Sequence, residues 1–382
     1  MKLLEVRHMA VAFKTQQGAL QAVRGIDFSV ERGEILGIVG ESGSGKSVAM
    51  LSLMGLLADN GRLLSGEITF DGENISPPPR AVSRADGPFL RERVCGALAH
   101  RRVWRAYRER MRTLRGREAA MIFQDPMTYL NPVLKIGVQM TEGLRLHKKC
   151  GRREAYGTAL SLLRQVGITS PEQRMRQYPF ELSGGMRQRI IVAIALSCGP
   201  KLLIADEPTT ALDVTIQAQL LDLIRTMTRE SRTSVIMITH DLGIVATMCD
   251  RIAIMYAGEI VEEGCTDEIF YTPMHPYTVG LLGSIANTER SVRQALVPIP
   301  GTPPDLLHLT GGCAFAPRCA EAMNICLTYR PEPTGRSRTQ RCRCWKYCAG
   351  AAREIVERQI RSRGGGADGD ADFGGGASLQ AL

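Results

Sequence analysis

The chain has 382 residues, of which 44% are hydrophobic and 23% are charged, and its formal net charge at pH 7 is +9. This length suits one large α/β domain with an appended piece, or two modest domains, and the composition is that of a soluble globular protein. No stretch approaches the ~20 continuous apolar residues that a membrane-spanning helix requires. Glu5, Arg7 and His8 interrupt the N-terminal segment before an apolar run can build, which argues against a signal peptide. We therefore expect a reducing, cytoplasmic environment.

The positive charge is concentrated in one segment, residues 80–117. Twelve arginines and three acidic residues give this segment a balance of +9, which equals the excess of the whole chain. A surplus of positive charge favours anionic partners such as nucleic acid or acidic lipid. Because the surplus is confined to one segment, a general nucleic-acid-binding face is not indicated, and no nucleic-acid partner is expected.

An apolar run, a glycine-rich loop and a helix-like segment follow one another between residues 34 and 59. The run EILGIV (34–39) predicts a strand, the loop GESGSGKS spans 40–47, and the residues after it predict a helix. This order is the context of a phosphate-binding loop, whose backbone N–H groups face the phosphates of a nucleotide. Lys46 supplies positive charge to these phosphates, and the Ser47 hydroxyl is a ligand for Mg²⁺. The glycines that let the backbone wrap in this way are Gly40, Gly43 and Gly45.

The positively charged segment also has helical periodicity. Its apolar residues fall three or four positions apart, which predicts a basic amphipathic helix in the second half of residues 76–116. These apolar residues are Trp104, Tyr107, Met111 and Leu114. Three roles are open for this helix: it lies on its own domain with its arginines in water, it contacts an anionic membrane surface, or it contacts RNA.

A second anion-binding helix start is predicted in LSGGMRQR (182–189). Ser183, Gly184 and Gly185 precede an apolar helix, and the N–H groups at a helix N-terminus bind anions. One polypeptide rarely needs two such sites for a single triphosphate. We therefore expect Ser183 to serve a nucleotide held by a different subunit, with the two subunits facing head to tail.

Two adjacent carboxylates end an apolar run in KLLIADEPTTALD (201–213). The run 202–205 suits a strand buried on both faces of a parallel sheet, whose carboxyl edge binds ligands. Neighbouring side chains of a strand point to opposite faces, so Asp206 and Glu207 cannot share one role. We assign Asp206 to Mg²⁺ and Glu207 to the attacking water, as a general base. His240 follows another apolar strand and is a candidate contact for the γ-phosphate.

In this order the motifs resemble those of the ATP-binding subunits of ABC transporters, over residues 1–265. GESGSGKS resembles the Walker A loop, FQDP the Q-loop, LSGGM the signature, LLIADE the Walker B strand, ALD the D-loop and TH the switch histidine. The resemblance implies an α/β fold, namely a P-loop ABC ATPase core with an antiparallel β subdomain, a helical signature subdomain and a small Cys-rich C-terminal extension. It also implies hydrolysis of ATP with Mg²⁺. Against this family, residues 76–117 are an unusually long basic insertion.

The resemblance also assigns roles to single residues. The implied catalytic residues are Glu207, His240 and Gln124. The implied Mg²⁺ ligands are Ser47, Gln124 and Asp206. The implied nucleotide-binding residues are Phe13, Gly40, Ser42, Gly43, Gly45, Lys46, Ser47, Ser183, Gly184, Gly185 and Asp213. Phe13 would stack on the adenine, and its alternative interpretation is an ordinary strand hydrophobe.

The region after residue 265 resembles the C-terminal extension of the peptide/nickel import branch, through HPYTVGLLGSI, VPIPGTPPDLL and CAFAPRC. MIFQDPMTYLNP (121–132) is close to the same branch, with Tyr129 where serine is usual. The resemblance implies an importer of di- or oligopeptides, with nickel or an opine-like solute as alternative cargo. It further implies a paralogous ATPase subunit, two transmembrane permease subunits and an external solute-binding protein as partners, at the cytoplasmic face of the inner membrane.

Six of the eleven cysteines lie within residues 313–348. In a reducing compartment, clustered cysteines bind metal more often than they form disulfides. The spacing of Cys313, Cys319 and Cys326 fits neither the common zinc pairs nor the plant-type ferredoxin run, so spacing alone names no metal. Scattered buried thiols are the alternative interpretation.

The resemblance implies a metal centre here, because members of the peptide-importer branch with this cysteine pattern are associated with a [4Fe–4S] cluster. Their fourth cysteine corresponds to Cys344, and Cys342 and Cys348 are its competitors. We expect the four sulfurs to converge on one centre, with a structural or redox-sensing role. A structural zinc is the alternative metal.

The expected organisation is a nucleotide-binding domain (1–265), a Cys-rich extension (266–350), and a helix end followed by a disordered Gly-rich tail (351–382). A soluble ABC ATPase of translation or DNA repair would need a second cassette or a long coiled coil, and the sequence contains neither. An iron–sulfur ABC ATPase not tied to transport is a further alternative, and an iron–sulfur electron carrier would leave the ATPase motifs idle.

Overall fold

The computed structural model describes residues 1–78, 97–124, 129–209, 213–284, 298–309, 311–348, 350 and 354. The chain divides into two compact units, Met1–Ile260 and Val261–Leu382, so the division falls before the expected residue 265. The expected disordered tail and the first half of the basic insertion lie outside the described residues. None of the helices in these ranges combines the length and the apolar composition that crossing a bilayer requires.

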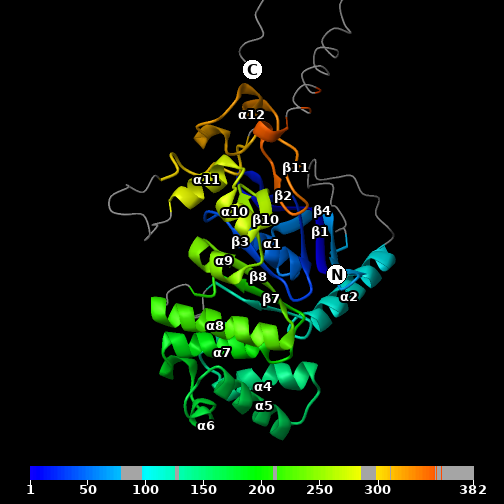
Figure 1. Ribbon diagram of the computed structural model, residues 1–382. Helices are drawn as coiled ribbons and strands as arrows, with labels where there is room; N and C mark the ends of the chain where they lie inside the picture. The colour runs from blue at the N-terminus through cyan, green and yellow to red at the C-terminus, as the bar shows by residue number, and fades with distance from the viewer. Residues whose placement is uncertain are drawn as a thin grey trace, which may run out of the picture. The chain divides into compact units, whose positions relative to one another are not determined.

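The first unit contains an antiparallel sheet with the strand order β2-β1-β4-β5 (Figure 1). Its strands are β1 (Lys2–Thr15), β2 (Gly18–Glu31), β4 (Gly61–Phe70) and β5 (Glu73–Asn74). Successive side chains of a strand point to opposite faces. In β2, Ile26, Phe28 and Val30 are buried while the residues between them are partly exposed. The expected antiparallel sheet is therefore confirmed, with one face on the core.

Five neighbouring parallel strands form the centre of this unit, in the order β9-β3-β8-β7-β6. They are β3 (Ile35–Val39), β6 (Ala119–Ile122), β7 (Leu202–Asp206), β8 (Ser234–Thr239) and β9 (Arg251–Tyr256). Every residue of β3, β6, β7 and β8 is buried, as expected for apolar runs that are covered on both faces. The carboxyl ends of parallel strands meet at one edge, which brings together the segments that follow them.

The helix after the phosphate loop is shorter than the sequence predicted. α1 spans Lys46–Leu53, whereas the apolar pattern continues to residue 59. Gly55 has a φ of +60°, and the N–H of Leu56 donates to the carbonyl oxygen of Leu51. This left-handed pattern ends α-helices, and glycine adopts it without strain. Gly55 therefore ends the helix, and the hydrophobic periodicity of the sequence does not reveal this end.

A layer of helices lies below the parallel strands in the view of Figure 1. It contains α4 (Ile136–His147), α5 (Arg152–Gln165), α6 (Pro171–Arg174), α7 (Gly184–Leu196) and α8 (Val214–Ser231), with the short η1 (Pro179–Glu181) before α7. The helix α9 (Leu242–Met248) follows β8. In α4 the buried residues fall at helical spacing, on one stripe that packs inward. These residues are Ile136, Met140 and Leu144.

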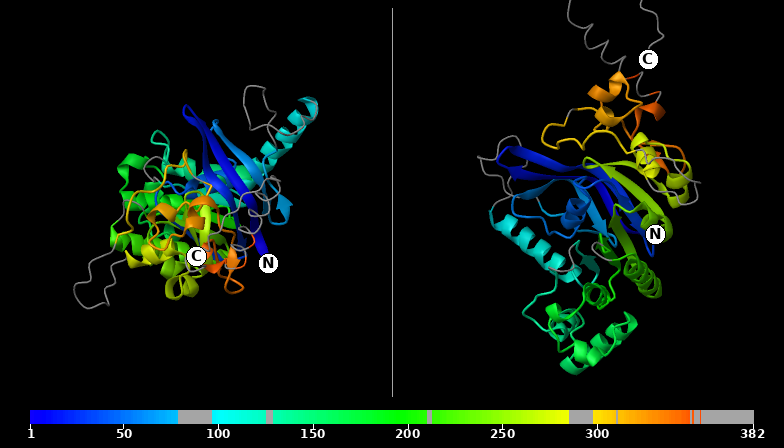
Figure 2. Two further views of the ribbon diagram at one scale, coloured as in Figure 1. Left: turned by 90° about the horizontal axis from the view of Figure 1, so that it is seen from above. Right: turned by 90° about the vertical axis from the view of Figure 1, so that its left-hand side faces the viewer.

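The second half of the basic insertion forms α2 (Ala97–Leu114), which leads into β6. Met111 and Leu114 are buried in the main core, and Trp104 and Tyr107 are half-buried. The expected amphipathic helix is therefore confirmed, with its apolar side against its own unit. Figure 2 shows that the N-terminal part of α2 projects away from the sheets of this unit.

The second unit is rich in loops. After β10 (Glu259–Cys265) its elements are α10 (Thr266–Tyr271), α11 (Pro276–Gly283), η2 (Ala316–Arg318), α12 (Asn324–Thr328), β11 (Thr334–Gly335), β12 (Arg341–Cys342) and η3 (Trp345–Tyr347). Buried residues form a small cluster of Ala316, Cys326, Trp345 and Cys348. The indole N–H of Trp345 donates to the carbonyl oxygen of Tyr329 at 2.7 Å, which satisfies the polar group of a buried tryptophan. The extension thus has a core of its own, built partly from cysteines.

Candidate active site

Lys46 is held inside the phosphate loop. Its Nζ donates to the carbonyl oxygens of Gly40 and Glu41, both at 2.8 Å, and to the hydroxyl of Ser44 at 3.3 Å. Burial lowers the pKa of Lys46, and the nearby carboxylate of Glu207 opposes this change. The three donors of the ammonium are therefore satisfied by the loop itself, and a phosphate oxygen would replace the loop carbonyls as their acceptor.

The loop has room only for glycine at two of the expected positions. A Cβ on Gly40 would lie 2.0 Å from the carbonyl oxygen of Met255. Gly45 has a φ of +98°, and a Cβ there would lie 2.4 Å from the carbonyl oxygen of Ala22. Gly43 has a φ of +78° but open space around it. Gly40 and Gly45 therefore let β9 and β2 approach the loop backbone closely. Gly43 is needed only for its positive φ, because no atom of the described residues lies close to an added Cβ.

Ser47 and Asp206 come together beside this loop, as expected. The Ser47 hydroxyl is hydrogen-bonded to the carboxylate of Asp206, which is only 4% exposed. Burial raises the pKa of Asp206, and the hydrogen bond with Ser47 opposes the rise. Within the described ranges, Oδ1 of Asp206 has no hydrogen-bond partner. A buried carboxylate oxygen without a partner, next to a hydroxyl, fits the oxygen ligation of Mg²⁺.

Glu207 is held between two of the other expected residues. Its Oε2 accepts from Nε2 of Gln124 at 3.0 Å, and its Oε1 lies 3.1 Å from Nδ1 of His240. The backbone of Glu207 has a φ of +46°, a left-handed region that non-glycine residues occupy at some cost. The three implied catalytic residues therefore meet, and they fix a carboxylate where it can accept a proton from a water molecule.

Asp206 and Glu207 are separated by a turn rather than by strand alternation. β7 ends at Asp206, and Glu207 already has the left-handed backbone. The next residue, Pro208, accepts a hydrogen bond from the amide of Gln188, which is fully buried in α7. Sequence reasoning missed this link, although a glutamine before the apolar run IIVAIALS is a signal for a buried polar contact. The link ties the signature helix to the turn that carries the proposed base.

The signature residues lie at the start of α7. The Ser183 hydroxyl accepts from the N–H of Met186 at 3.4 Å, so it caps this helix, and Asp213 caps α8 by accepting from the N–H of Ile216 at 3.0 Å. In the part of the chain that the structure describes, no hydrogen bond or ion pair joins Ser183, Gly184 or Gly185 to the phosphate loop. Their service to another subunit's nucleotide therefore stays a prediction.

Phe13 lies near the end of β1, opposite Gly61 of β4. It is half-buried and packs against the main hydrophobic core. Its ring carbons are the nearest atoms to the space above Gly61, so a larger residue at Gly61 would displace the ring. Both interpretations of Phe13, the adenine platform and the strand hydrophobe, agree with this position.

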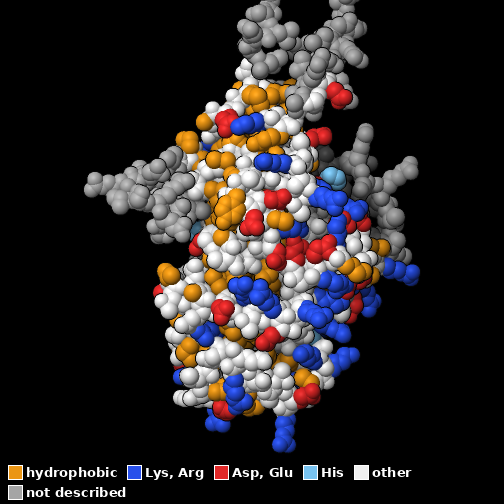
Figure 3. All heavy atoms as spheres, viewed as in Figure 1, with side chains coloured by type: hydrophobic (Ala, Val, Ile, Leu, Met, Phe, Trp, Pro, Cys, Tyr) orange, Lys and Arg blue, Asp and Glu red, His pale blue; other side chains and the backbone are white. Residues whose placement is uncertain are grey.

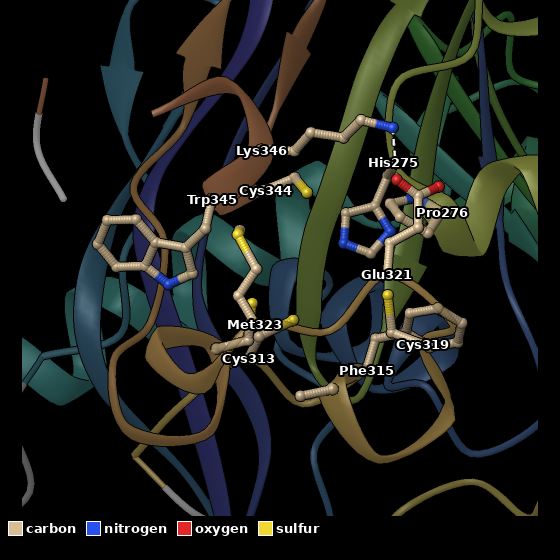
Figure 4. Close-up of a pocket in the computed structure, with 12 residues that line it drawn as sticks. His275, Pro276, Cys313, Phe315, Cys319, Glu321, Met323, Cys344, Trp345 and Lys346 are labelled. Carbon is tan, nitrogen blue, oxygen red and sulfur yellow. Dashed lines mark hydrogen bonds and ion pairs between the residues drawn. The ribbon is translucent and has the colours of Figure 1, made fainter. Parts of the chain in front are cut away.

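Four cysteines line one pocket in the second unit (Figure 4). They are Cys313, Cys319, Cys326 and Cys344, and they share the pocket with His275, Phe315, Met323 and Trp345. However, no group of three or more His, Cys, Asp or Glu side chains in the described ranges is arranged to hold a metal ion. The four cysteines therefore share one pocket, but the structure does not show their sulfurs arranged around a metal, and the shared metal centre stays a prediction. Burial raises the pKa of the Cys319 thiol and raises that of Cys344 to about 11.

The pocket distinguishes Cys344 from its two competitors, which are not among the lining residues. Cys342 lies in β12, paired with Glu262 of β10, and burial raises the pKa of its thiol. Sγ of Cys348 lies 2.8 Å from the hydroxyl of Thr334. Among the three, only Cys344 shares the space with the first three cysteines.

His275 is a lining residue that the sequence did not single out. It is 1% exposed, and its Nδ1 accepts from the N–H of Tyr277 at 3.0 Å, so it caps α11. Burial lowers the pKa of His275 to about 4, so the ring is neutral at pH 7 and its proton is assigned to Nε2. The signal was the proline after it, since proline is frequent at the first position of a helix.

Two family descriptions match the chain. The ABC transporter family matches residues 23–210, which contain the phosphate loop, Gln124, the signature and the two carboxylates. The C-terminal region of oligopeptide/dipeptide transporters matches residues 261–326, which contain the first three clustered cysteines.

Curated relatives cover nearly the whole chain. The oligopeptide transport ATP-binding protein OppD of Bacillus subtilis (strain 168) is 48% identical over 345 residues, 90% of this chain and 88% of that protein. The dipeptide transport ATP-binding protein DppD of the same organism is 46% identical over 344 residues, 90% of this chain and 94% of that protein. The ATP-binding cassette MJ0796, solved with ADP and phosphate, has the same fold, with a TM-score of 0.55 and 22% identity over 69% of this chain and 98% of that one. The chain therefore belongs to the ABC transporter family, in the branch of oligopeptide and dipeptide transport ATP-binding proteins.

Proposed function

We propose that this chain is the ATP-hydrolysing subunit that powers an ABC importer of di- or oligopeptides. The observation that carries the proposal is the carboxylate of Glu207, held between Gln124 and His240 on the sheet edge that also carries the phosphate loop. The relatives that are 48% and 46% identical are oligopeptide and dipeptide transport ATP-binding proteins, which favours peptides over nickel or an opine-like solute.

Five side chains divide the work of hydrolysis. Lys46 exchanges the loop carbonyls for phosphate oxygens and neutralises charge that develops there. Ser47 and Asp206 hold Mg²⁺, which supplies further positive charge to the phosphates. Glu207 accepts the proton of the attacking water. His240 fixes the Glu207 carboxylate and faces the γ-phosphate side of the site.

The assembly follows from the second anion-binding helix start. A nucleotide held by a paralogous ATPase subunit binds to Ser183 and to the N–H groups of Gly184 and Gly185. Asp213 is a further contact for this nucleotide. Two permease subunits and an external solute-binding protein complete the importer, with this chain peripheral at the cytoplasmic face of the membrane. The position of Ser183 supports a nucleotide shared between two subunits. Ser183 caps α7, whereas the chain's own phosphate loop precedes α1.

The test is reconstitution of the complete importer. The chain alone should be a weak ATPase, and the complex with the paralogous subunit, the permeases and a peptide-loaded binding protein should hydrolyse ATP at least tenfold faster, since each site needs a signature from the other subunit. ATP turnover and uptake into proteoliposomes are measured with dipeptides, longer peptides, nickel and opines. Full ATPase activity from a preparation shown to be monomeric by light scattering would contradict the shared ATP site. Uptake of nickel alone would show that the cargo is nickel and not peptides.

We also propose that Cys313, Cys319, Cys326 and Cys344 hold a [4Fe–4S] cluster in the extension 266–350, with a structural zinc as the alternative. The support is that all four line one pocket. Binding requires the thiols to lose their protons and the sulfurs to move together. The cluster would stiffen a loop-rich unit or sense oxidants, without a part in ATP hydrolysis.

Anaerobic purification tests the cluster. The parent protein should be brown and contain about four irons per chain, as Cys₄ ligation of such clusters requires. Cys344→Ser should lose the iron and the colour, while Cys342→Ser, the matched control two residues away, should keep both. Colourless parent protein with one zinc would establish the alternative metal. Equal loss of iron and colour in both variants would contradict the choice of Cys344 over Cys342 as the fourth ligand.

A further inference from the structure

The outer side of α2 carries arginines that the ATP site does not use. Four exposed arginines follow one another at intervals of four, three and four residues, which places them on one stripe of the helix. We name this set the arginine stripe; it consists of Arg101, Arg105, Arg108 and Arg112. At 1.5 Å per residue, the stripe is about 16 Å long. Figure 3 shows Lys and Arg side chains gathered on the side of the molecule where α2 lies.

The helix is held to its own unit by other residues. Met111 and Leu114 are buried in the core, and Arg110 donates to Glu73 at 2.7 Å and to Glu118 at 2.8 Å. Just after the helix, Nε of Arg115 donates to the backbone carbonyl oxygen of Met54 at 2.7 Å. These contacts anchor the C-terminal part of α2 to the core.

Arg110 is paired with acidic side chains, whereas in the described residues the arginines of the stripe form no such pairs. Within the described ranges, none of its four arginines makes a hydrogen bond or an ion pair. Glu109 is the one acidic residue of α2, against six arginines between positions 101 and 112. Like charges three or four residues apart destabilise a helix. An anionic partner would therefore gain direct contacts and also relieve this repulsion.

The other side chains of α2 narrow the chemistry of the partner. Trp104 and Tyr107 stack edge to face at 5.6 Å and are half-buried on the side of the core, so the stripe offers no aromatic platform for the bases of a single-stranded nucleic acid. Met111 and Leu114 are buried in the core, and Tyr107 packs against it. Val103, which is 53% exposed, is a single apolar side chain and does not make an apolar face that could insert into a bilayer. The arginine stripe is therefore suited to adsorb to an extended anionic surface, rather than to stack bases or to insert into a bilayer.

We propose that the arginine stripe binds the anionic phospholipid headgroups of the membrane surface. The cytoplasmic leaflet attracts basic segments, and each arginine near it strengthens binding by about fivefold. The contact is electrostatic, because α2 has no continuous exposed apolar face among its described residues, and it should weaken steeply with salt. It adds a lipid contact to the proposed attachment through the permeases and does not depend on it, so its failure would leave the ATPase proposal intact.

The test measures binding of the purified full chain to vesicles by co-sedimentation. Vesicles of 30% phosphatidylglycerol in phosphatidylcholine should bind the parent protein, vesicles of pure phosphatidylcholine should not, and 0.5 M salt should release it. Arg105→Gln/Arg108→Gln should weaken binding about 25-fold. Arg105→Lys/Arg108→Lys keeps the charge and should bind within twofold to threefold of the parent, which excludes an effect of misfolding.

The matched control removes two other exposed arginines. Arg152 and Arg153 at the start of α5 are exposed and belong to the same unit, so Arg152→Gln/Arg153→Gln lowers the net charge equally. This control should bind within about twofold of the parent. Equal weakening by both glutamine pairs would show that net charge alone acts and would overturn the proposal. The proposal also fails if the parent ignores phosphatidylglycerol, or if polyuridylate competes for the stripe more strongly than the vesicles do.

Discussion

Glu207→Gln should retain ATP binding and lose ATP turnover in the assembled importer. The amide has the shape of the carboxylate and can still pair with Gln124, but it cannot accept a proton from water. General-base catalysis typically contributes about 10²- to 10⁴-fold in rate, and we expect kcat to fall by that factor. Binding is read from the thermal shift with ATP, which at about 100 times Kd adds about 2.7 kcal/mol to the free energy of unfolding.

Lys46→Ala is the control that separates chemistry from binding. Lys46 donates to two carbonyl oxygens of its own loop and is the residue proposed to hold the phosphates. Its removal should abolish both the ATP-dependent thermal shift and the turnover. A Glu207→Gln importer that hydrolyses ATP at the parental rate would show that another group activates the water.

The nucleotide site could be predicted from the sequence because its determinants are local. A strand, a glycine loop and a helix follow directly on one another, so Lys46 and Ser47 were assigned without knowledge of distant contacts. The apolar runs of β7 and β8 are fully buried, as continuous hydrophobic strands should be, and their ends deliver Asp206 and His240 to the sheet edge.

Contacts between distant residues could not be predicted in the same way. Gln124 and Glu207 lie 83 residues apart, and the pairing of their side chains depends on how β6 and β7 align. The hydrogen bond from Gln188 to Pro208 likewise joins two elements that no motif relates. The left-handed backbone of Glu207 is also invisible in the sequence, because glycine is the only residue type that signals such a conformation reliably.

The cysteine pocket shows the same limit. Spacing and resemblance group the four cysteines that line it. In the structure Cys342 ends β12 and Cys344 precedes η3, and only Cys344 of these two lines the pocket. Phe315 and Trp345 line the same pocket, and sequence spacing does not encode their place beside the cysteines. A sequence pattern can therefore group residues that share a pocket without giving the geometry of their side chains.

Gly40→Ala should both destabilise the first unit and abolish ATP binding. The added Cβ would lie 2.0 Å from the carbonyl oxygen of Met255, and 3.0 Å from the hydroxyl of Ser44. Because a backbone carbonyl in a central strand cannot rotate away, β9 or the loop must shift. Overpacking of this kind costs about 3 kcal/mol, which for a unit of this size lowers Tm by roughly 6–12 °C. The shifted loop would no longer aim its N–H groups at the phosphates, so ATP should give no thermal shift.

Gly143→Ala is the matched control and should change stability in the opposite direction. Gly143 lies within α4, has no atom within 4 Å of a new Cβ, and does not need a positive φ. Replacing a helical glycine by alanine stabilises a helix by up to about 1 kcal/mol, so Tm should stay level or rise, with the ATP shift intact. Thermal unfolding of both variants, with and without ATP, decides the matter. A Gly40→Ala protein with parental Tm and a normal ATP shift would contradict the close approach of β9 to the phosphate loop.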